Sequence, residues 1–457
     1  MNVDVRNPAT GEVCTTFSST SSKGVEDAVS AAASAFVEWR RTPPAQRSAA
    51  LLLIARDLAD QAGAFAEVES QEAGKPLTAV LCDELPAMVD QLQFFAGAAR
   101  RLDVPSAGEY VVDHSSSVRR EAIGVCAQIT PWNYPLMMAV WKLAPAIAAG
   151  NCVVIKPSEL TPSSTRMMVE LAARHLPEGV VNIVLGGADV GRALVSDSRV
   201  DLIALTGSTR AGREVASIAA TRTARVHLEL GGNAPVVVFD DADVDRVVDV
   251  AGRAAYYNAG QDCTAPSRFI VAASRHDEFV ERLTKMASSL RVGQTDDPST
   301  ELGPVASESQ RSRVLGLVTG RSAGASVATG GRAIDGPGYF IEPTVIVGVD
   351  QSEELVQGEI FGPVITVQRF DDELAALAMA NGVEQGLASS VWTADHARAL
   401  RAARDLNFGA VWINTHGPSP AELPHGGFGS SGYGKDLSAY GLEDYTRIKH
   451  VTSWLGR

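Results

Sequence analysis

Cysteine is scarce in this chain of 457 residues, and the few cysteines follow no metal-binding or disulfide pattern. They are odd in number and widely spaced: Cys14, Cys82, Cys126, Cys152 and Cys263. No pair has the Cys-x-x-Cys spacing of a zinc or redox site, and secreted disulfide frameworks use a denser, even set. The sequence therefore predicts no bound metal, no disulfide and a reducing compartment, which we take to be the cytoplasm.

Positive charge and long apolar segments are also in short supply. Lys and Arg number 40 against 54 Asp and Glu, so the formal net charge is −14, and there is no basic tract. A nucleic-acid partner is therefore not expected. The first residues contain no apolar signal core, and the apolar stretch at 136–155 is interrupted by Lys142, Pro145 and Asn151. We expect no membrane partner, because a span needs about 20 predominantly apolar residues.

The chain is longer than one hydrophobic core usually requires, so two or three domains are expected. Helical spacing relates four apolar residues: Leu51, Ile54, Ala55 and Leu58. Short apolar runs alternate with helical patterns in two series: 152–155, 181–185 and 201–205, then 235–239, 268–271 and 410–413. This alternation predicts an α/β fold with parallel sheets. The turn at 231–233 separates the series and marks the best domain boundary.

Two segments fit neither series. Residues 109–113 and 117–122 flank residues 114–116 and predict an antiparallel hairpin, and residues 445–451 predict one more strand. A lone hairpin is marginally stable in water. A neighbouring subunit's sheet would stabilise these strands, so we expect a homodimer or a homotetramer.

The most informative residue is Cys263, which lies in the polar loop NAGQDCTA (258–265). Buried cysteines are commonly inert packing, but a polar loop favours an accessible thiol. Glu229 lies upstream on an apolar strand pattern, where an unpartnered carboxylate costs several kcal/mol unless it has a function or a partner. A thiol, a lone carboxylate and a phosphate-cradling turn indicate covalent catalysis coupled to a nucleotide. That combination predicts oxidation of an aldehyde through a thioester.

The phosphate-cradling turn is Gly207-Ser208, which ends a predicted strand and opens a helix. Free N–H groups and the helix dipole attract a pyrophosphate there, although the turn lacks the GxGxxG fingerprint and Ser208 could simply cap the helix. Lys156 and Glu159 lie at another strand end, where α/β sheets bind ligands. Lys156 can donate to ribose hydroxyls, whereas Glu159 would repel a 2′-phosphate, so NAD is favoured over NADP. The alternative is a solvated surface pair.

Seven motifs make the chain resemble the aldehyde dehydrogenases over almost its whole length. They are PWNYP (131–135), KPSE (156–159), TGST (206–209), LELGG (228–232), GQDC (260–263), EIFGP (359–363) and SGYG (431–434). The resemblance implies a Rossmann-like NAD-binding domain at 1–105 and 124–232, an α/β catalytic domain at 233–432, and a small β oligomerisation element at 106–123 and 433–457. It also implies NAD contacts from twelve residues: Thr130, Pro131, Trp132, Lys156, Ser158, Glu159, Gly207, Ser208, Gly212, Leu230, Glu359 and Phe361.

The residues suggest how such an enzyme would work. Attack by the Cys263 thiolate makes a thiohemiacetal, whose oxyanion can expel hydride. The Asn133 side-chain amide and the Cys263 backbone N–H are suited to hold that oxyanion, a contribution of roughly 3–4 kcal/mol in known oxyanion holes. Glu229 is the candidate base for hydrolysis of the thioester. Lys142 either tunes the proton network or is a surface lysine with its head in water, and Asn133 taken alone could cap a helix.

Within the family, the sequences of two segments, 256–265 and 432–445, resemble the ω-aminoaldehyde branch, particularly the γ-aminobutyraldehyde dehydrogenases. Asn233 departs from that branch and is like some succinate-semialdehyde dehydrogenases, and residues 416–421 depart as well. Aromatic faces and a carboxylate suit an ammonium tail. The substrate contacts expected on this basis are Tyr134, Trp141, Asp262 and Trp412.

We therefore expect an NAD-dependent aldehyde dehydrogenase whose small-molecule substrate is an ω-aminoaldehyde such as 4-aminobutanal. Succinic semialdehyde, betaine aldehyde and a broad range of aldehydes are the alternative substrates. Acyl transfer to coenzyme A is disfavoured because Glu229 supplies a hydrolytic base. The alternative of another class is an inactive relic with a structural or binding role, and the intact Asn133, Glu229 and Cys263 argue against it.

Overall fold

Strands buried on both faces build the first main sheet of the computed structural model, which describes residues 2–101 and 107–456. The strand order is β19-β9-β8-β5-β6-β7, parallel except for the edge strand β19. The strands are β5 (Val125–Ile129), β6 (Cys152–Lys156), β7 (Val181–Ile183), β8 (Val200–Gly207), β9 (Arg225–Leu230) and β19 (Gly432–Tyr433). Runs rich in Val, Ile and Leu are typical of a sheet covered by helices on both faces.

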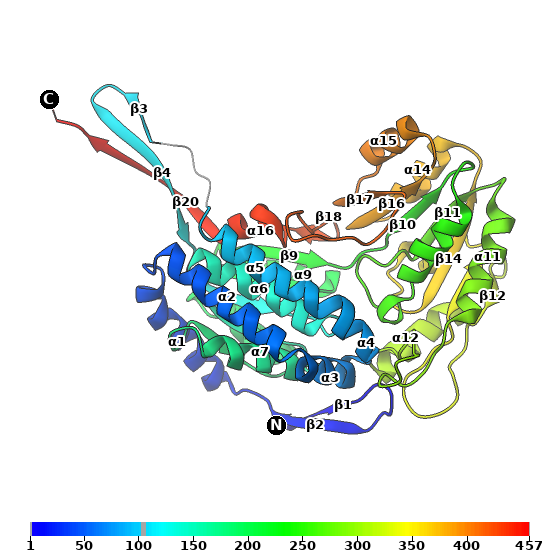
Figure 1. Ribbon diagram of the computed structural model, residues 1–457, viewed down its shortest axis with the longest axis horizontal. Helices are drawn as coiled ribbons and strands as arrows, with labels where there is room; N and C mark the ends of the chain where they lie inside the picture. The colour runs from blue at the N-terminus through cyan, green and yellow to red at the C-terminus, as the bar shows by residue number, and fades with distance from the viewer. Residues whose placement is uncertain (1, 102–106, 457) are drawn as a thin grey trace.

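Helices cover this sheet in layers (Figure 1). One face carries α1 (Ser22–Trp39), α8 (Ala188–Ser196) and α9 (Thr209–Ala220). The other carries α6 (Pro135–Ala149) and α7 (Ser163–Ala173), with α2 (Pro44–Asp60), α3 (Ala62–Ala73) and α5 (Leu85–Ala98) packed outside them. The predicted stripe on α2 is confirmed, since Leu51, Ile54, Ala55 and Leu58 are all buried.

The apolar stretch at 136–155 forms α6 and β6, both enclosed by protein. A helix that is apolar on every side is buried, and α6 lies between the sheet and the outer helices. Within the described ranges, no helix is long and apolar enough to cross a membrane.

The second main sheet has seven strands in the order β12-β13-β14-β11-β10-β16-β17, parallel except for β12. These are β10 (Pro235–Val238), β11 (Arg268–Ala272), β12 (Ser326–Thr329), β13 (Thr344–Val347), β14 (Val364–Phe370), β16 (Ala388–Trp392) and β17 (Ala410–Ile413). Its helices are α10 (Val244–Val247), α11 (His276–Ser289), α12 (Glu308–Thr319), α13 (Glu354–Gln357), α14 (Glu373–Asn381) and α15 (His396–Asp405). Both expected strand series are therefore present, each in a sheet of its own.

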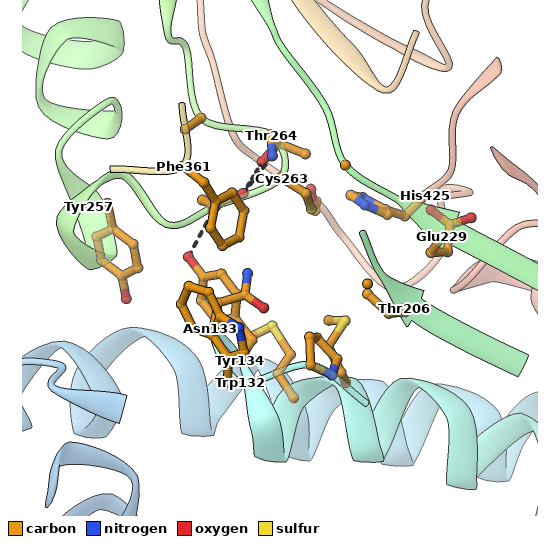
Figure 2. A pocket seen from close by; sticks show the side chains of 18 of the residues that line it. Trp132, Asn133, Tyr134, Thr206, Glu229, Tyr257, Cys263, Thr264, Phe361 and His425 are labelled. Atoms are coloured by element: carbon orange, nitrogen blue, oxygen red, sulfur yellow. Dashed lines mark hydrogen bonds between the residues drawn. The ribbon is translucent and has the colours of Figure 1, made fainter. Parts of the chain in front are cut away.

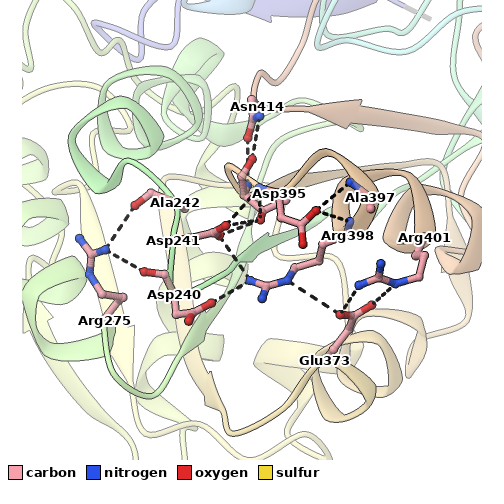
Figure 3. A network of polar contacts seen from close by, with 11 residues as sticks. Asp240, Asp241, Ala242, Arg275, Glu373, Asp395, Ala397, Arg398, Arg401 and Asn414 are labelled. Carbon is pink, nitrogen blue, oxygen red and sulfur yellow. Dashed lines mark hydrogen bonds and ion pairs between the residues drawn. The ribbon is translucent and has the colours of Figure 1, made fainter.

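Ion pairs close the carboxyl edge of this second sheet (Figure 3). Arg398 of α15 pairs with Asp240, which follows β10, at 2.8 Å, and its guanidinium lies 4.9 Å from the centre of the Phe239 ring. Asp241 accepts from the Thr393 hydroxyl at 2.7 Å, and Arg401 pairs with Glu373 at 3.1 Å. The network ties the loops after β10 and β16 to α14 and α15.

A three-stranded arm projects from the body (Figure 1). It contains β3 (Gly108–Val111), β4 (His114–Ala122) and β20 (Thr446–Trp454), which follows α16 (Ser438–Asp444). The predicted hairpin and terminal strand are present, but the turn falls at residues 112–113 rather than 114–116. The register also shows that β20 pairs along β4 of the same chain, from Thr446 opposite Ala122 to Trp454 opposite His114.

Shorter elements complete the chain. They are β1 (Asn2–Arg6), β2 (Val13–Ser18), α4 (Leu77–Ala79), the π-helices η1 (Val80–Glu84) and η2 (Val248–Gly252), the 3₁₀ turn η3 (Tyr257–Gly260), β15 (Gln385–Gly386) and β18 (Phe428–Gly429).

Candidate active site

A pocket of about 800 Å³ opens between the two main sheets and is lined by both (Figure 2). The first sheet contributes the segments at the carboxyl ends of its strands: residues 131–134 follow β5, Gly207 ends β8, and Glu229 lies near the end of β9. The second sheet contributes loops that precede its strands, with Cys263 before β11 and Glu359 before β14. The predicted nucleophile, base and nucleotide turn therefore share one pocket.

An unusual backbone presents Cys263 to the pocket. Three successive residues, Asn258, Ala259 and Gly260, have φ of 50°, 54° and 68°, in the left-handed region. A side chain at Gly260 would place its Cβ 2.1 Å from the carbonyl oxygen of Gly362, so glycine is required there. The Asn258 side chain holds the loop by donating to the carbonyls of Asn133 at 2.9 Å and Gln261 at 3.2 Å. Such strain persists only where surrounding contacts fix it, as at catalytic loops.

Asn133 points its amide at the same loop. Its Nδ2 donates to the Gln261 carbonyl at 2.9 Å, and an amide nitrogen has a second hydrogen to offer. The helix-capping alternative is not what the structure shows, because the N-cap of α6 is Tyr134 and no side chain caps it. Asn133 is therefore placed to donate into the pocket beside Cys263.

The electrostatics of the pocket oppose negative charge. Burial, followed by the carboxylates of Asp262, Glu359 and Glu229, holds the pKa of the Cys263 thiol well above its usual value. Burial, with Asp436 nearby, also raises the pKa of Glu229 well above the ordinary range. Neither Glu229 oxygen has a hydrogen-bond partner, although the side chain is only 3% exposed. When it is ionised, a buried carboxylate with a raised pKa and free oxygens is a stronger base than an exposed one, and it can accept a proton from a water molecule in the pocket.

Lys142 is fully buried rather than at the surface, so the surface-lysine alternative is wrong. Its Nζ pairs with Asp436 at 3.1 Å, and Asp436 lies 3.1 Å from His227, two residues before Glu229 on β9. Burial alone would raise the pKa of Asp436, but Lys142 and His227 lower it. Burial would lower the pKa of His227, but the carboxylates of Asp436 and Asp444 raise it to about 9. Lys142 thus belongs to a charged cluster behind Glu229 and does not line the pocket.

Known proteins share this fold over the whole chain. A profile of the aldehyde dehydrogenase family matches residues 1–451. The chain belongs to the aldehyde dehydrogenase family. Betaine aldehyde dehydrogenases of Mesorhizobium japonicum and Bacillus subtilis are 38% and 39% identical to it over 454 residues, covering 97% of this chain and 92% of each relative.

Solved structures agree with this assignment. A putative aldehyde dehydrogenase from Burkholderia cenocepacia superposes with a TM-score of 0.97 at 39% identity, covering all of this chain and 94% of that one. Betaine aldehyde dehydrogenase from Staphylococcus aureus, solved in complex with NAD⁺, has a TM-score of 0.97 at 37% identity and covers 100% and 92% of the two chains. The resemblance seen in the motifs, the expected fold and the enzyme class are confirmed: this aldehyde dehydrogenase is an oxidoreductase.

One wall of the pocket has the features of a nucleotide site. We define this nucleotide wall as Pro131, Trp132, Gly207, Ser208, Leu230, Glu359 and Phe361. Ser208 does cap α9, since its Oγ accepts from the Ala211 N–H. The first turn of this helix, whose other N–H groups lack helical partners, lies at the pocket, because Ser208 and Arg210 line it. Gly212 has no room for a side chain, because a Cβ would lie 2.5 Å from Leu230.

The dehydrogenase also leaves polar atoms unpaired near this wall. The buried hydroxyls of Thr130 and Thr206, at the carboxyl ends of β5 and β8, have no hydrogen-bond partner. Glu359 accepts from the Gly232 N–H at 2.9 Å, and burial raises its pKa to about 7. The residues present therefore fit a dinucleotide.

The Lys156–Glu159 pair lies outside the pocket lining. Lys156 is buried and donates to the carbonyls of Pro157 and Gly186 at 2.8 and 2.7 Å, while Glu159 lies 3.8 Å away with a half-exposed side chain. Thr130, Ser158 and Gly212 also lie behind the lining. The pair is thus not a fully solvated one, because Lys156 is anchored and only the carboxylate is accessible.

Another part of the pocket lining is acidic and aromatic. We define this acidic wall as Asp83, Glu84, Tyr134, Trp141, Tyr257 and Asp262. Three of the four expected substrate residues lie in it. Trp412 does not line the pocket; its ring packs against His416 at 4.6 Å, and its Nε1 donates to the Pro418 carbonyl.

Sequence reasoning missed several lining residues of the dehydrogenase. Asp83 and Glu84 are adjacent acids at the end of η1, a π-helix that no apolar periodicity reveals. Burial raises the pKa of Glu84 to about 7, although Lys75 pairs with it at 2.7 Å. His425 packs against Trp141, with ring centres 4.9 Å apart, and lies near Glu229 (Figure 2). The sequence carries no distinctive signal for these acids, since adjacent acids also occur at 240–241, 277–278, 296–297 and 353–354.

Proposed function

We propose that this aldehyde dehydrogenase uses NAD to oxidise an aldehyde with a cationic tail, 4-aminobutanal being the leading candidate. The observation that carries the proposal is the acidic wall: three carboxyl groups and three aromatic rings line the same pocket as the nucleotide wall. The arginines that line the pocket are Arg210 in α9 and Arg313, which donates to the Glu359 carbonyl. Neither belongs to the acidic wall, so an anionic tail such as that of succinic semialdehyde lacks a partner there.

The pocket residues divide the chemistry between them. The Cys263 thiol loses its proton to water, and its sulfur forms a bond to the aldehyde carbon as the carbonyl π bond opens; the resulting oxyanion accepts hydrogen bonds from Asn133 Nδ2 and the Cys263 N–H. When the oxyanion re-forms the carbonyl, hydride leaves the carbon and a thioester on Cys263 remains. NAD, when bound along the nucleotide wall, supplies the hydride acceptor. Glu229 then takes a proton from the water that attacks the thioester, and the acid leaves with Cys263 returned to a thiol.

The acidic wall also distinguishes two kinds of cationic tail. A primary ammonium donates hydrogen bonds and gains most from Asp83, whereas a trimethylammonium group has no N–H and gains most from aromatic faces. Glu84 contributes through its charge, because its oxygens already accept from Lys75 at 2.7 Å and from Tyr257 at 3.5 Å. Asp262 is already engaged, because Oδ2 accepts from Tyr134 at 2.7 Å and Oδ1 accepts from Thr264. The curated betaine aldehyde dehydrogenases are relatives, so betaine aldehyde is the main competing substrate.

The deciding experiment is a kcat/KM panel in NADH absorbance with 4-aminobutanal, betaine aldehyde, succinic semialdehyde and pentanal. We expect 4-aminobutanal to be oxidised most efficiently and succinic semialdehyde least. A preference for betaine aldehyde would show that the aromatic rings, and not the carboxylates, select the cationic tail. A preference for succinic semialdehyde would refute the proposal of a cationic substrate. No NADH from any aldehyde, with NAD still bound, would favour an inactive relic, and a requirement for coenzyme A would indicate acyl transfer.

We further infer that the arm is the oligomerisation element and that the two main sheets are the cores of the NAD-binding and catalytic domains. The arm exposes large apolar side chains that its own chain leaves uncovered: Tyr110, Val111, Val112, Ile448, Trp454 and Leu455. Residues 102–106 of the proposed boundary lie outside the described residues. Sedimentation of the chain with and without Ile448→Asp tests this inference, which predicts dimers or tetramers that dissociate in the variant.

A further inference from the structure

The turn that carries the nucleophile is anchored on both sides of Cys263. The Ala265 N–H donates to the Asp262 carbonyl at 3.1 Å, which closes a turn with Cys263 and Thr264 at its centre. On one side, Tyr134 donates to the Asp262 carboxylate at 2.7 Å. On the other, the Thr264 carbonyl lies 2.8 Å from Nε2 of His416. The Tyr134 contact comes from the first sheet's side of the pocket and the His416 contact from the second sheet's side.

The hydrogen bonds of His416 have only one consistent direction. The Thr264 carbonyl can only accept, so Nε2 of His416 carries the proton. Nδ1 lies 3.0 Å from the Ser390 hydroxyl, and that hydroxyl accepts from the indole Nε1 of Trp392 at 3.1 Å. Burial lowers the pKa of His416 to about 4, so the imidazole is neutral and Nδ1 accepts from Ser390. The chain of donors therefore runs from Trp392 through Ser390 and His416 to Thr264.

Most of this chain of donors is buried, and the imidazole lies where it meets the pocket. Ser390 and Trp392 belong to β16 and are at most 1% exposed, and His416 is 6% exposed. The Trp412 ring packs on the imidazole and restricts its rotation. Directional hydrogen bonds in a water-poor interior strengthen one another, so the imidazole orientation is well determined.

We propose that His416 is a positioning residue: the Trp392–Ser390–His416 relay fixes the Thr264 carbonyl and thereby holds the Cys263 sulfur in its reactive position. The inference rests on Cys263 as the nucleophile and not on which aldehyde is oxidised. A displacement of about 1 Å at a reacting atom can cost on the order of a hundredfold in rate. His416 lies in the segment 416–421, which departs from the ω-aminoaldehyde pattern, and the relay gives part of that departure a role.

The test compares three variants of His416: in two of them the hydrogen-bond donor lies at different positions, and in the third the donor is absent. In His416→Gln the amide nitrogen can take the place of Nε2, in His416→Asn it reaches only the place of Nδ1, and in His416→Phe the ring remains without a donor. The first readout is the rate of Cys263 alkylation by iodoacetamide, followed on the Cys263 peptide by mass spectrometry because Cys14 and Cys82 are also exposed. This readout requires no aldehyde, so it is independent of the proposed substrate. The second readout is the rate of the NADH burst with 4-aminobutanal or, if that is not a substrate, with the best aldehyde of the panel.

We expect His416→Asn and His416→Phe to lower the rates of Cys263 alkylation and of the NADH burst by about tenfold or more. In His416→Gln both rates should stay within about threefold of the wild type. Dissociation constants for NAD and melting temperatures should remain close to wild type in His416→Gln. Ser390→Ala should slow both rates by a few-fold and add nothing in the His416→Asn background, because the two residues act in series. Equal rates for Gln and Asn, whether fast or slow, would overturn the proposal and leave His416 with packing alone; this comparison holds even if His416→Phe does not fold.

Discussion

The two main sheets present opposite edges to the same pocket. In the first sheet the carboxyl ends of the strands line the pocket, as parallel α/β sheets usually arrange their ligand sites. In the second sheet, ion pairs around Arg398 close much of the carboxyl edge (Figure 3). The pocket receives loops from the amino edge, before β11 and β14, and also residues of the segment 416–419, which follows β17. The first sheet thus supplies Asn133 and Glu229 from its strand ends, whereas the second supplies Cys263 and Glu359 from loops that neighbouring segments must hold in place.

The strongest test of this division removes the group that the second sheet supplies. Cys263→Ala should abolish NADH formation, a loss on the order of a thousandfold or more, because no other thiol lines the pocket among the described residues. NAD binding, measured by fluorescence titration, should stay nearly unchanged, since the nucleotide wall belongs mostly to the first sheet. Near-normal turnover in this variant would contradict covalent catalysis.

Glu229 lies on the first sheet, and in the proposed mechanism it acts on the intermediate that Cys263 holds. Glu229→Gln should preserve a pre-steady-state burst of NADH and slow steady turnover by about a hundredfold or more, because only the attack of water needs the base. Stopped-flow absorbance separates the two phases. If burst and steady rate fall together, Glu229 acts before hydride transfer, in activation of the thiol.

The acidic wall should make affinity for a cationic tail depend on pH. The pKa of Glu84 is raised to about 7, so the carboxyl is mostly neutral at pH 6 and mostly ionised at pH 8. The KM for 4-aminobutanal should therefore fall by about fivefold across that range, equivalent to about 1 kcal/mol. Pentanal, which has no charge, is the control and should show no such fall. Glu84→Gln keeps an acceptor for Lys75 and should abolish the trend; a trend that survives would assign it to another group.

The Lys156–Glu159 pair should affect the choice between NAD and NADP less than the acidic wall affects the choice of aldehyde. Glu159→Gln removes a half-exposed carboxylate, so the ratio of kcat/KM for NAD over NADP should narrow by a few-fold, the amount expected of a partly solvated charge. An unchanged ratio would mean that Glu159 does not face the adenosine ribose.

The closed edge of the second sheet should matter for stability alone. Arg398→Ala removes the pairs with Asp240 and Asp241 and the contact with Phe239, and we expect the free energy of unfolding to fall by about 1 kcal/mol. Denaturant titration measures this change, and kcat should stay within error. A large loss of activity would show that the carboxyl edge communicates with the pocket.

Much of this dehydrogenase follows from local sequence. Periodicity placed the α2 stripe and the strand series, because burial of one helix face or of a whole strand dictates which residues are apolar. The motifs around Asn133, Glu229 and Cys263 identified the family, since each is a short contiguous segment whose backbone shape needs particular residues.

Contacts between distant segments were decided only by the tertiary structure. The sequence could not show that Asp83 and Glu84 face Asp262, that Trp412 packs behind His416, or that β20 pairs with β4 of its own chain. Nor could it show that Lys142 is buried against Asp436, almost three hundred residues away. Periodicity reports whether a side chain is buried, whereas its partner depends on how the two sheets and their loops pack, and that packing is a property of the whole chain.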